Sequence, residues 1–161
     1  MMEPINNLFA SISAYADMSP DLSIRREVNQ RLKISSRDEL ELSSWCRLYS
    51  DRAGDRPVLA FIYQQFAEYS GLSFGRVRPS DRLVKDLHLP LVCWFDWVLT
   101  FCEDFFQQFD VDLSDCFDED NFETVDDMIA FLLKQVKSSS TVVTTGSLPA
   151  LTAERVPVAV R

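Results

Sequence analysis

The chain has 161 residues, of which 47% are hydrophobic and 25% are charged, so it can bury one sizeable core. Its formal net charge of −9 is unevenly spread: residues 1–85 carry twelve basic and eleven acidic side chains, and residues 134–161 carry four basic and one acidic. Residues 86–133 carry thirteen acidic side chains and no Lys or Arg. This segment would repel a phosphate backbone, so nucleic acid is excluded as its partner and a protein with a basic surface is expected.

Residues 1–56 are predicted to form an N-terminal helical extension. Ser19 followed by Pro20 is typical of a helix start, and we expect a first helix to about residue 33. Ser36 and Glu39 have the spacing of a capping box, which predicts a second helix through about Tyr49. Residues 50–56 then form a linker. The extension either packs on the following bundle or forms a separate helical hairpin.

Residues 57–137 contain the clearest helical patterns. Pro57 begins a helix that ends before Gly71, and a loop follows to about residue 80. Pro90 lies in the first turn of the next predicted helix, residues 91–109, which carries an apolar stripe on one side. Residues 110–123 are an acidic loop.

The last helix is predicted to begin at a second capping pattern, formed by Thr124 and Asp127, and to end near residue 137. Beyond it, residues 138–161 are rich in small and hydroxyl side chains and predict a disordered C-terminal tail. No strand pattern accompanies these helices. The predicted fold class is therefore all-α: a helical bundle with an N-terminal extension and a flexible tail.

Three short motifs accompany this order of helices and loops. They are Ser80-Asp81-Arg82-Leu83-Val84-Lys85-Asp86-Leu87, Phe109-Asp110-Val111-Asp112-Leu113 and Thr124-Val125-x-Asp127-x-Ile129-x-Phe131. Together they resemble the acyl carrier proteins, and in particular small enterobacterial carrier-like proteins of unknown function. The resemblance covers about half of the chain. It implies an acyl-carrier-like helical bundle over residues 57–137, whose acidic second helix faces partner proteins.

The motif that holds the prosthetic group in that family is missing. Acyl carrier proteins attach phosphopantetheine to a serine in an Asp-Ser-Leu motif at the start of the second helix. The matching position in this chain is Leu91 or Phe95, depending on the end from which residues are counted. No serine lies between Ser80 and Ser114, and Thr100 lies well inside the predicted helix. The resemblance therefore implies the fold and the docking surface but no cofactor.

No catalytic or metal site is predicted. The Cys46, Cys93, Cys102 and Cys116 thiols form no C-x-x-C pair, and His88 is the sole histidine. Residues 110–121 begin with the carboxylate spacing of a calcium loop but lack its central glycine and closing glutamate. We expect reduced, mostly buried thiols in a cytoplasmic protein that is not an enzyme.

Neither a signal peptide nor membrane insertion is expected. Glu3 stands where a signal peptide needs positive charge, and no Lys or Arg precedes Arg25. The most apolar stretch, residues 87–102, is too short to span a bilayer and is interrupted by Pro90 and Asp96.

The function predicted from these features is a non-enzymatic, carrier-like protein-interaction module that docks a basic partner. The residues expected to bind it are Asp96, Trp97, Glu103 and Asp104, with the tryptophan as the apolar anchor. Two alternatives stay open. One is a genuine acyl or peptidyl carrier with a displaced attachment residue, and the other is a small acidic chaperone or adaptor for a secreted or toxic protein.

Overall fold

The structure, a computed structural model, describes residues 19–145, with side chains through residue 141. This part of the chain is helical and contains no β-strand, apart from an isolated bridge between Arg82 and Thr124. The all-α prediction is confirmed. The elements follow in the order α2 (Leu22–Ile34), α3 (Leu42–Arg47), η1 (Ala53–Asp55), α4 (Arg56–Ser70), η2 (Phe74–Arg76), α5 (Leu89–Val92), α6 (Trp97–Phe109), η3 (Glu119–Asn121) and α7 (Val125–Thr145).

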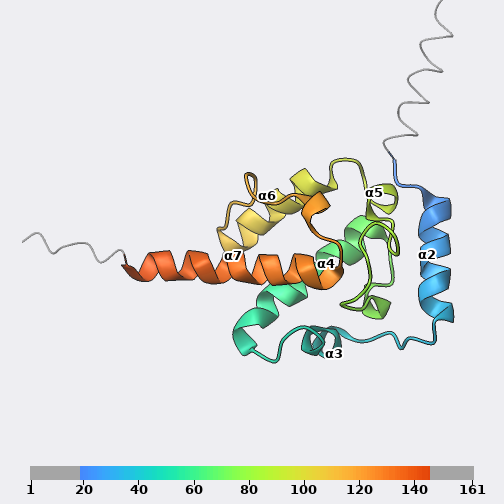
Figure 1. Cartoon of the computed structure of the whole chain (residues 1–161), viewed down its shortest axis with the longest axis horizontal. Coiled ribbons are helices and arrows are strands. Elements are labelled where there is room, and N and C mark those ends of the chain that lie inside the picture. The colour runs from blue at the N-terminus through green and yellow to red at the C-terminus, as the bar shows by residue number, and fades with distance from the viewer. Residues whose placement is uncertain (1–18, 146–161) are drawn as a thin grey trace, which may run out of the picture.

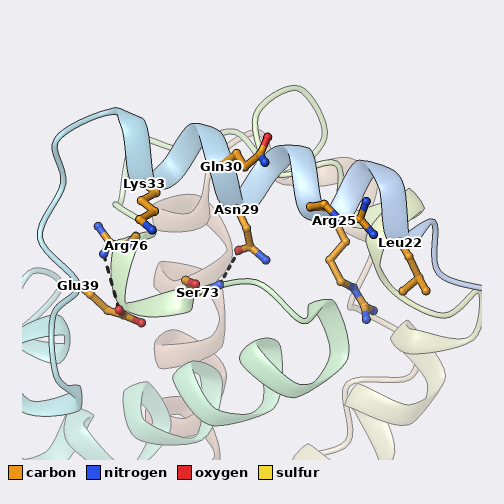
Figure 2. A pocket seen from close by; sticks show the side chains of 9 residues that line it. Leu22, Arg25, Asn29, Gln30, Lys33, Glu39, Ser73 and Arg76 are labelled. Atoms are coloured by element: carbon orange, nitrogen blue, oxygen red, sulfur yellow. Dashed lines mark hydrogen bonds and ion pairs between the residues drawn. The ribbon is translucent and has the colours of Figure 1, made fainter.

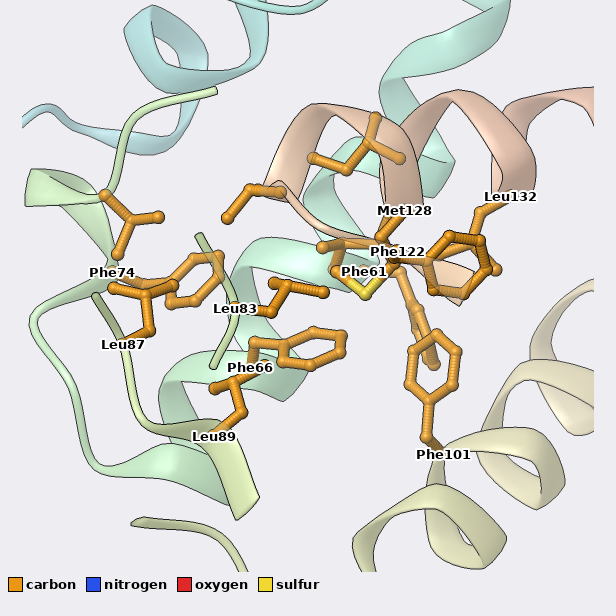
Figure 3. Close-up of a cluster of buried hydrophobic side chains, with 14 of the residues drawn as sticks. Phe61, Phe66, Phe74, Leu83, Leu87, Leu89, Phe101, Phe122, Met128 and Leu132 are labelled. Carbon is orange, nitrogen blue, oxygen red and sulfur yellow. The ribbon is translucent and has the colours of Figure 1, made fainter. Parts of the chain in front are cut away.

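Helix α4 lies at the centre of the molecule and contacts α3, α5 and α7 (Figure 1). Its Phe66 is fully buried, with its ring centroid 5.3 Å from that of Phe101 and 5.6 Å from that of Trp97, both on α6. Met128 and Leu132 of α7 close the same core, which Figure 3 shows together with leucines from the segment before α6. The apolar stripes of three helices therefore meet in one cluster.

The N-terminal extension packs on this bundle and does not form a separate hairpin. Val28 and Leu32 of α2 belong to the same buried cluster, and α2 lies against α5. Trp45 of α3 is completely buried, and its indole Nε1 donates a hydrogen bond to the Val77 carbonyl oxygen at 3.1 Å. Both predicted helices of the extension therefore contribute to the common core.

The predicted start of the second helix is wrong. Ser36 does not cap a helix but has a left-handed backbone with φ of 56°, and α3 begins only at Leu42. The backbone between them is held by the loop that follows α4: the Leu40 amide donates to the Gly75 carbonyl at 3.0 Å, and Arg78 Nη2 donates to the Asp38 carbonyl at 2.7 Å. These tertiary contacts override the local capping pattern. The first helix likewise begins with Asp21 as its cap, instead of Ser19.

The boundaries predicted around α4 and at the start of α7 are confirmed. Pro57 lies in the first turn of α4, and Gly71 ends the helix in a left-handed conformation with φ of 64°. At α7, the Asp127 amide donates to Thr124 Oγ1 at 3.2 Å, and the Thr124 amide donates to Asp127 Oδ2 at 3.0 Å. This reciprocal pair is the capping box that the sequence predicts.

The predicted helix over residues 91–109 is broken in the structure. Helix α5 ends at Val92, its C-cap Cys93 has an extended backbone with ψ of 163°, and α6 begins only at Trp97. The interruption has a packing reason, because α5 lies against both α2 and α4. Leu89, Val92 and Cys93 are buried there, before the chain turns to lay α6 along the other side of the bundle (Figure 1).

The predicted tail begins too early. Helix α7 continues to Thr145, so residues 138–145 are helical. Val136 packs against the core, and Lys137 Nζ lies 3.3 Å from Oδ1 of the buried Asp55. The Ser140 and Thr141 hydroxyls donate to carbonyls one turn earlier, so these polar residues are accommodated within the helix. Residues 146–161 of the predicted tail lie outside the described residues.

Candidate functional site

Helix α6 presents two apolar faces, and only one of them is covered. Trp97, Phe101 and Phe105 face the core and are at most 6% exposed. A second ridge follows the outer side of the helix, where Leu99 is 74% and Phe106 50% exposed, and Phe95, in the turn just before the helix, is 65% exposed. We call Phe95, Leu99, Cys102 and Phe106 the α6 stripe. Contiguous exposed apolar side chains of this kind mark interaction surfaces.

A groove of about 320 Å³ lies along the stripe. Leu99, Cys102 and Phe106 form one wall, and Phe117 of the acidic loop contributes to the other. Phe117 is 7% exposed because its ring packs on Phe101, with 5.1 Å between centroids. The loop is therefore held in place by its buried aromatic residue, so the groove has a supported shape.

Carboxylates flank the stripe on both sides. Glu103 lines the groove, and Asp96, the N-cap residue of α6, lies seven residues before it, about two turns away along the helix axis. Asp112 lines the groove on the other side. Hydrogen bonds from the Ser114 hydroxyl and amide hold the pKa of Asp112 below its usual range, so it is ionised at neutral pH. An apolar surface bounded by negative charge is the result.

The structure separates the four residues that the sequence predicted for partner binding. Glu103 is exposed and lines the groove beside the stripe, and Asp96, at the N-cap of α6, is partly exposed. Trp97 is only 6% exposed and packs between Phe66 and Phe117, so its prediction as an exposed anchor is wrong.

Asp104 lies on a different side of α6 from the stripe. Its carboxylate accepts a hydrogen bond from the Tyr69 hydroxyl of α4. Burial, together with this carboxylate, raises the pKa of Tyr69, which keeps the phenol protonated as the donor. Asp104 therefore serves a contact within the bundle, and its predicted role in partner binding loses its geometric basis.

The residues that sequence reasoning missed are Phe95, Leu99, Cys102 and Phe106. Their spacing of four, three and four residues is itself helical. The same segment carries a second helical spacing through Trp97, Phe101 and Phe105, and one predicted stripe was assigned to the core. The presence of two interleaved apolar ridges on one helix indicates that one of the two ridges is exposed to solvent.

The start of α6 has no exposed hydroxyl group. Asp96 occupies the N-cap position, and the exposed side chains before it are Trp94 and Phe95. The Thr100 hydroxyl lies one turn into the helix, 3.4 Å from the Asp96 carbonyl oxygen. The helix start that would bear phosphopantetheine in a carrier protein is thus occupied by large apolar residues.

Neither thiol near the stripe is activated. Burial raises the pKa of Cys93 to about 12, although Arg25 acts in the opposite direction. Burial also raises the pKa of Cys102, and the neighbouring Cys116 and Asp112 add to this effect. Both thiols are protonated at neutral pH, which makes them poor nucleophiles.

A second hollow lies beneath α2 and is lined by basic side chains (Figure 2). Two of these basic side chains already make contacts within the protein. Arg25 Nη2 donates to the Val92 carbonyl at 2.6 Å, and Arg76 lies 3.7 Å from the Glu39 carboxylate. The other two, Arg26 and Lys33, are exposed along α2. This groove is open and its charge is partly neutralised, so it is a weaker candidate than the α6 stripe.

Membrane-spanning helices and metal clusters are both absent from the described part of the chain. Between residues 19 and 145, none of the helices has both the length and the apolar character needed to cross a bilayer. In the same range, no three His, Cys, Asp or Glu side chains are grouped closely enough to hold a metal ion.

Comparison with known proteins does not assign a family. No family model matches the chain, and neither a curated protein nor a solved structure does. The resemblance to acyl carrier proteins therefore rests on the sequence motifs alone and stays a prediction.

Proposed function

We propose that this protein is a cytoplasmic, non-enzymatic interaction module that docks an amphipathic, basic segment of a partner protein on the α6 stripe. The observation that carries the proposal is the stripe itself, a set of exposed apolar side chains along a groove that Glu103 and Asp112 also line. The partner would place apolar side chains in the groove and Lys or Arg side chains against the carboxylates.

The magnitudes favour docking driven by apolar contact and selected by charge. Burying a Leu or Phe side chain contributes about 1.5–3 kcal/mol, whereas an exposed ion pair contributes about 0–1 kcal/mol. Leu99 and Phe106 would therefore supply most of the affinity. The carboxylates would accelerate association with basic partners and disfavour acidic ones.

The proposal retains the acidic docking helix that the resemblance to acyl carrier proteins implies, but not the attachment of phosphopantetheine. An acyl carrier protein also presents an acidic second helix to its partners, and α6 has the matching place in the chain. Incubation with a phosphopantetheinyl transferase and coenzyme A is expected to leave the mass unchanged. A mass gain on any serine would instead support a genuine carrier with a displaced attachment residue.

Direct docking is tested with two synthetic amphipathic helices, one of leucine and lysine and one of leucine and glutamate. The lysine peptide is expected to bind, and Leu99→Asp to weaken its binding about ten-fold or more. Ile34→Asp is the matched control, because Ile34 is 79% exposed on α2, away from the stripe. Equal binding of both peptides, or indifference to Leu99→Asp, would overturn the proposal.

The chaperone alternative predicts a different experimental result. A chaperone would keep a cationic client soluble, whereas a docking module need only bind its partner. Aggregation of a basic client segment, followed by light scattering with and without this protein, separates the two. Suppression of aggregation that Leu99→Asp abolishes would favour the chaperone.

A further inference from the structure

We propose that the α6 stripe binds the exposed side of α2 in a second copy of this chain, so that the protein associates with itself head to tail. This inference rests on the proposed function, since it names one partner of the same site. That partner has to offer a basic segment with exposed apolar side chains, and α2 is such a segment. Leu22, at its start, is 63% exposed, and Arg26 and Lys33 are exposed further along the helix.

The three side chains lie on one side of α2, because Arg26 follows Leu22 by four residues and Lys33 follows Arg26 by seven. They line the hollow beneath the helix, whose volume is about 570 Å³ (Figure 2). The lining of this α2 hollow contains four basic side chains and one acidic side chain, Glu39. Among the described residues, Arg26 and Lys33 form no ion pair, so their charges are available to a partner.

The α6 stripe is complementary to the α2 hollow in charge and in length. Leu99 and Phe106 are exposed along α6, and Glu103 lies between them in the chain. On the rise of an α-helix, Leu99 and Phe106 are about 10 Å apart, whereas the side of α2 from Leu22 to Lys33 is about 16 Å long. The exposed apolar side chains of α6 therefore fit within the length of the hollow, and the carboxylate of Glu103 meets basic side chains there.

The two surfaces cannot meet within one chain, because both helices are fixed in the fold. The Asn29 side chain of α2 donates to the Gly71 carbonyl at 3.1 Å and accepts the Ser73 amide at 2.8 Å. Helix α6 is held by Phe101 and Phe105 in the core. In Figure 1, α2 stands at one edge of the molecule and α6 lies on the other side of the bundle. The contact therefore forms only between copies.

One such contact uses the α6 stripe of one copy and the α2 hollow of the next. It leaves an α2 hollow free on the first copy and an α6 stripe free on the second, so the contact repeats until it closes a ring or grows into a chain. The net charge of −9 makes the copies repel one another at longer range. We therefore expect a weak association that increases with concentration.

Analytical ultracentrifugation of the full chain tests the proposal with two variants. Arg26→Glu combined with Lys33→Glu alters the α2 hollow and leaves the stripe intact, whereas Leu99→Asp alters the stripe and leaves the hollow intact. The average mass of the wild type is expected to rise with concentration, and each variant alone to associate about ten-fold more weakly or less. A mixture of the two variants is expected to form a dimer with one copy of each and to stop there, because only one intact stripe and one intact hollow can meet.

Arg47→Glu combined with Lys134→Glu is the matched control. Both side chains are exposed, on α3 and α7, and neither lines the α2 hollow or the groove along the stripe. The double substitution changes the net charge by the same amount as the α2 variant. It is expected to associate like the wild type, which separates local charge from net charge.

Several results would overturn self-association. They are a wild type that stays monomeric up to millimolar concentration, a variant of either surface that associates as strongly as the wild type, a mixture of the two variants that stays monomeric, and a control that loses association as fully as the α2 variant. Binding of the lysine peptide that depends on Leu99 would then leave the docking function intact, and only the second copy would be lost as its partner. Absence of peptide binding would remove both proposals.

Discussion

Arg37 binds the carboxylate of Asp81 through two parallel hydrogen bonds. Nη1 lies 2.7 Å from Oδ2, and Nη2 lies 2.8 Å from Oδ1. Asp81 is only 5% exposed, and its Oδ2 also accepts the Arg78 amide at 2.8 Å. This pair joins the loop after α2 to the loop before α5. It explains why the N-terminal extension is held against the bundle.

Arg37→Met should destabilise the protein by about 2–4 kcal/mol, because Asp81 would stay buried without its counter-charge. Arg82→Met is the matched control. Arg82 binds Asp86 with similar geometry at 3.0 Å, but both side chains are exposed to solvent and the expected loss is below about 1 kcal/mol. Urea unfolding measures both. Equal losses would mean that burial of Asp81 is not the deciding factor.

The two faces of α6 should respond differently to the same substitution. Phe101→Ala removes a fully buried ring and is expected to cost about 3–5 kcal/mol, whereas Phe106→Ala should cost below about 1 kcal/mol. Thermal or urea unfolding of the two variants gives the comparison. Phe106→Ala, which leaves the protein folded, is expected to weaken binding of the lysine peptide. Equal losses of stability would show that both faces of α6 are packed.

Gly71 should not tolerate a side chain. Its φ is 64°, and a Cβ there would lie 2.7 Å from Cδ and Nε of Arg25. Gly71→Ala is expected to cost about 1–2 kcal/mol or more, because the left-handed backbone and the contact add. Gly54→Ala is the control, since a Cβ at that residue would meet nothing within 4 Å and a change within about 0.5 kcal/mol is expected. Urea unfolding compares the two variants, and a harmless Gly71→Ala would show that α4 can end differently.

The buried Asp55 makes part of the stability depend on pH. Burial alone would raise the pKa of Asp55, but the hydrogen bond from Ser50 and the ion pair with Lys137 more than offset it, so the pKa is lowered. A carboxylate with a lowered folded pKa stabilises the fold above its unfolded pKa of about 4, and this contribution is lost as pH falls through the folded value. Asp55→Asn should therefore cost stability at pH 7.

The cost of Asp55→Asn should shrink as the pH falls below about 4, because the wild-type carboxylate is then losing its charge as well. Unfolding free energies of the two proteins between pH 7 and pH 3 test this. Curves that stay parallel over that range would show that the pair with Lys137 contributes no pH-dependent stability.

Local chemistry was enough to predict several elements. Pro57 and Gly71 bound α4, and Thr124 with Asp127 starts α7, because a fixed φ, a left-handed backbone and a capping box act within a few residues. Where a local signal met a competing long-range contact, it lost. The Ser36 capping pattern yields to two long-range hydrogen bonds, one from the Leu40 amide to the Gly75 carbonyl and one from Arg78 to the Asp38 carbonyl, and these partners are about forty residues apart in the chain.

The candidate site likewise has some properties that the sequence determines and others that depend on long-range contacts. The sequence by itself determined that residues 86–133 are strongly acidic and aromatic, that no serine lies between Ser80 and Ser114, and that residues 19–145 are all-α. Those properties depend on composition and on helical periodicity. Which of two apolar ridges on α6 is buried depends on what packs against them.

Only the tertiary structure decided that Trp97, Phe101 and Phe105 enter the core while Leu99 and Phe106 remain exposed. The Phe66 ring of α4 packs against Trp97 and Phe101, so this side of α6 faces inward. Both ridges have the same period, so periodicity cannot rank them. The free energy of packing against α4 and α7 can, because it depends on neighbours that are distant in the sequence.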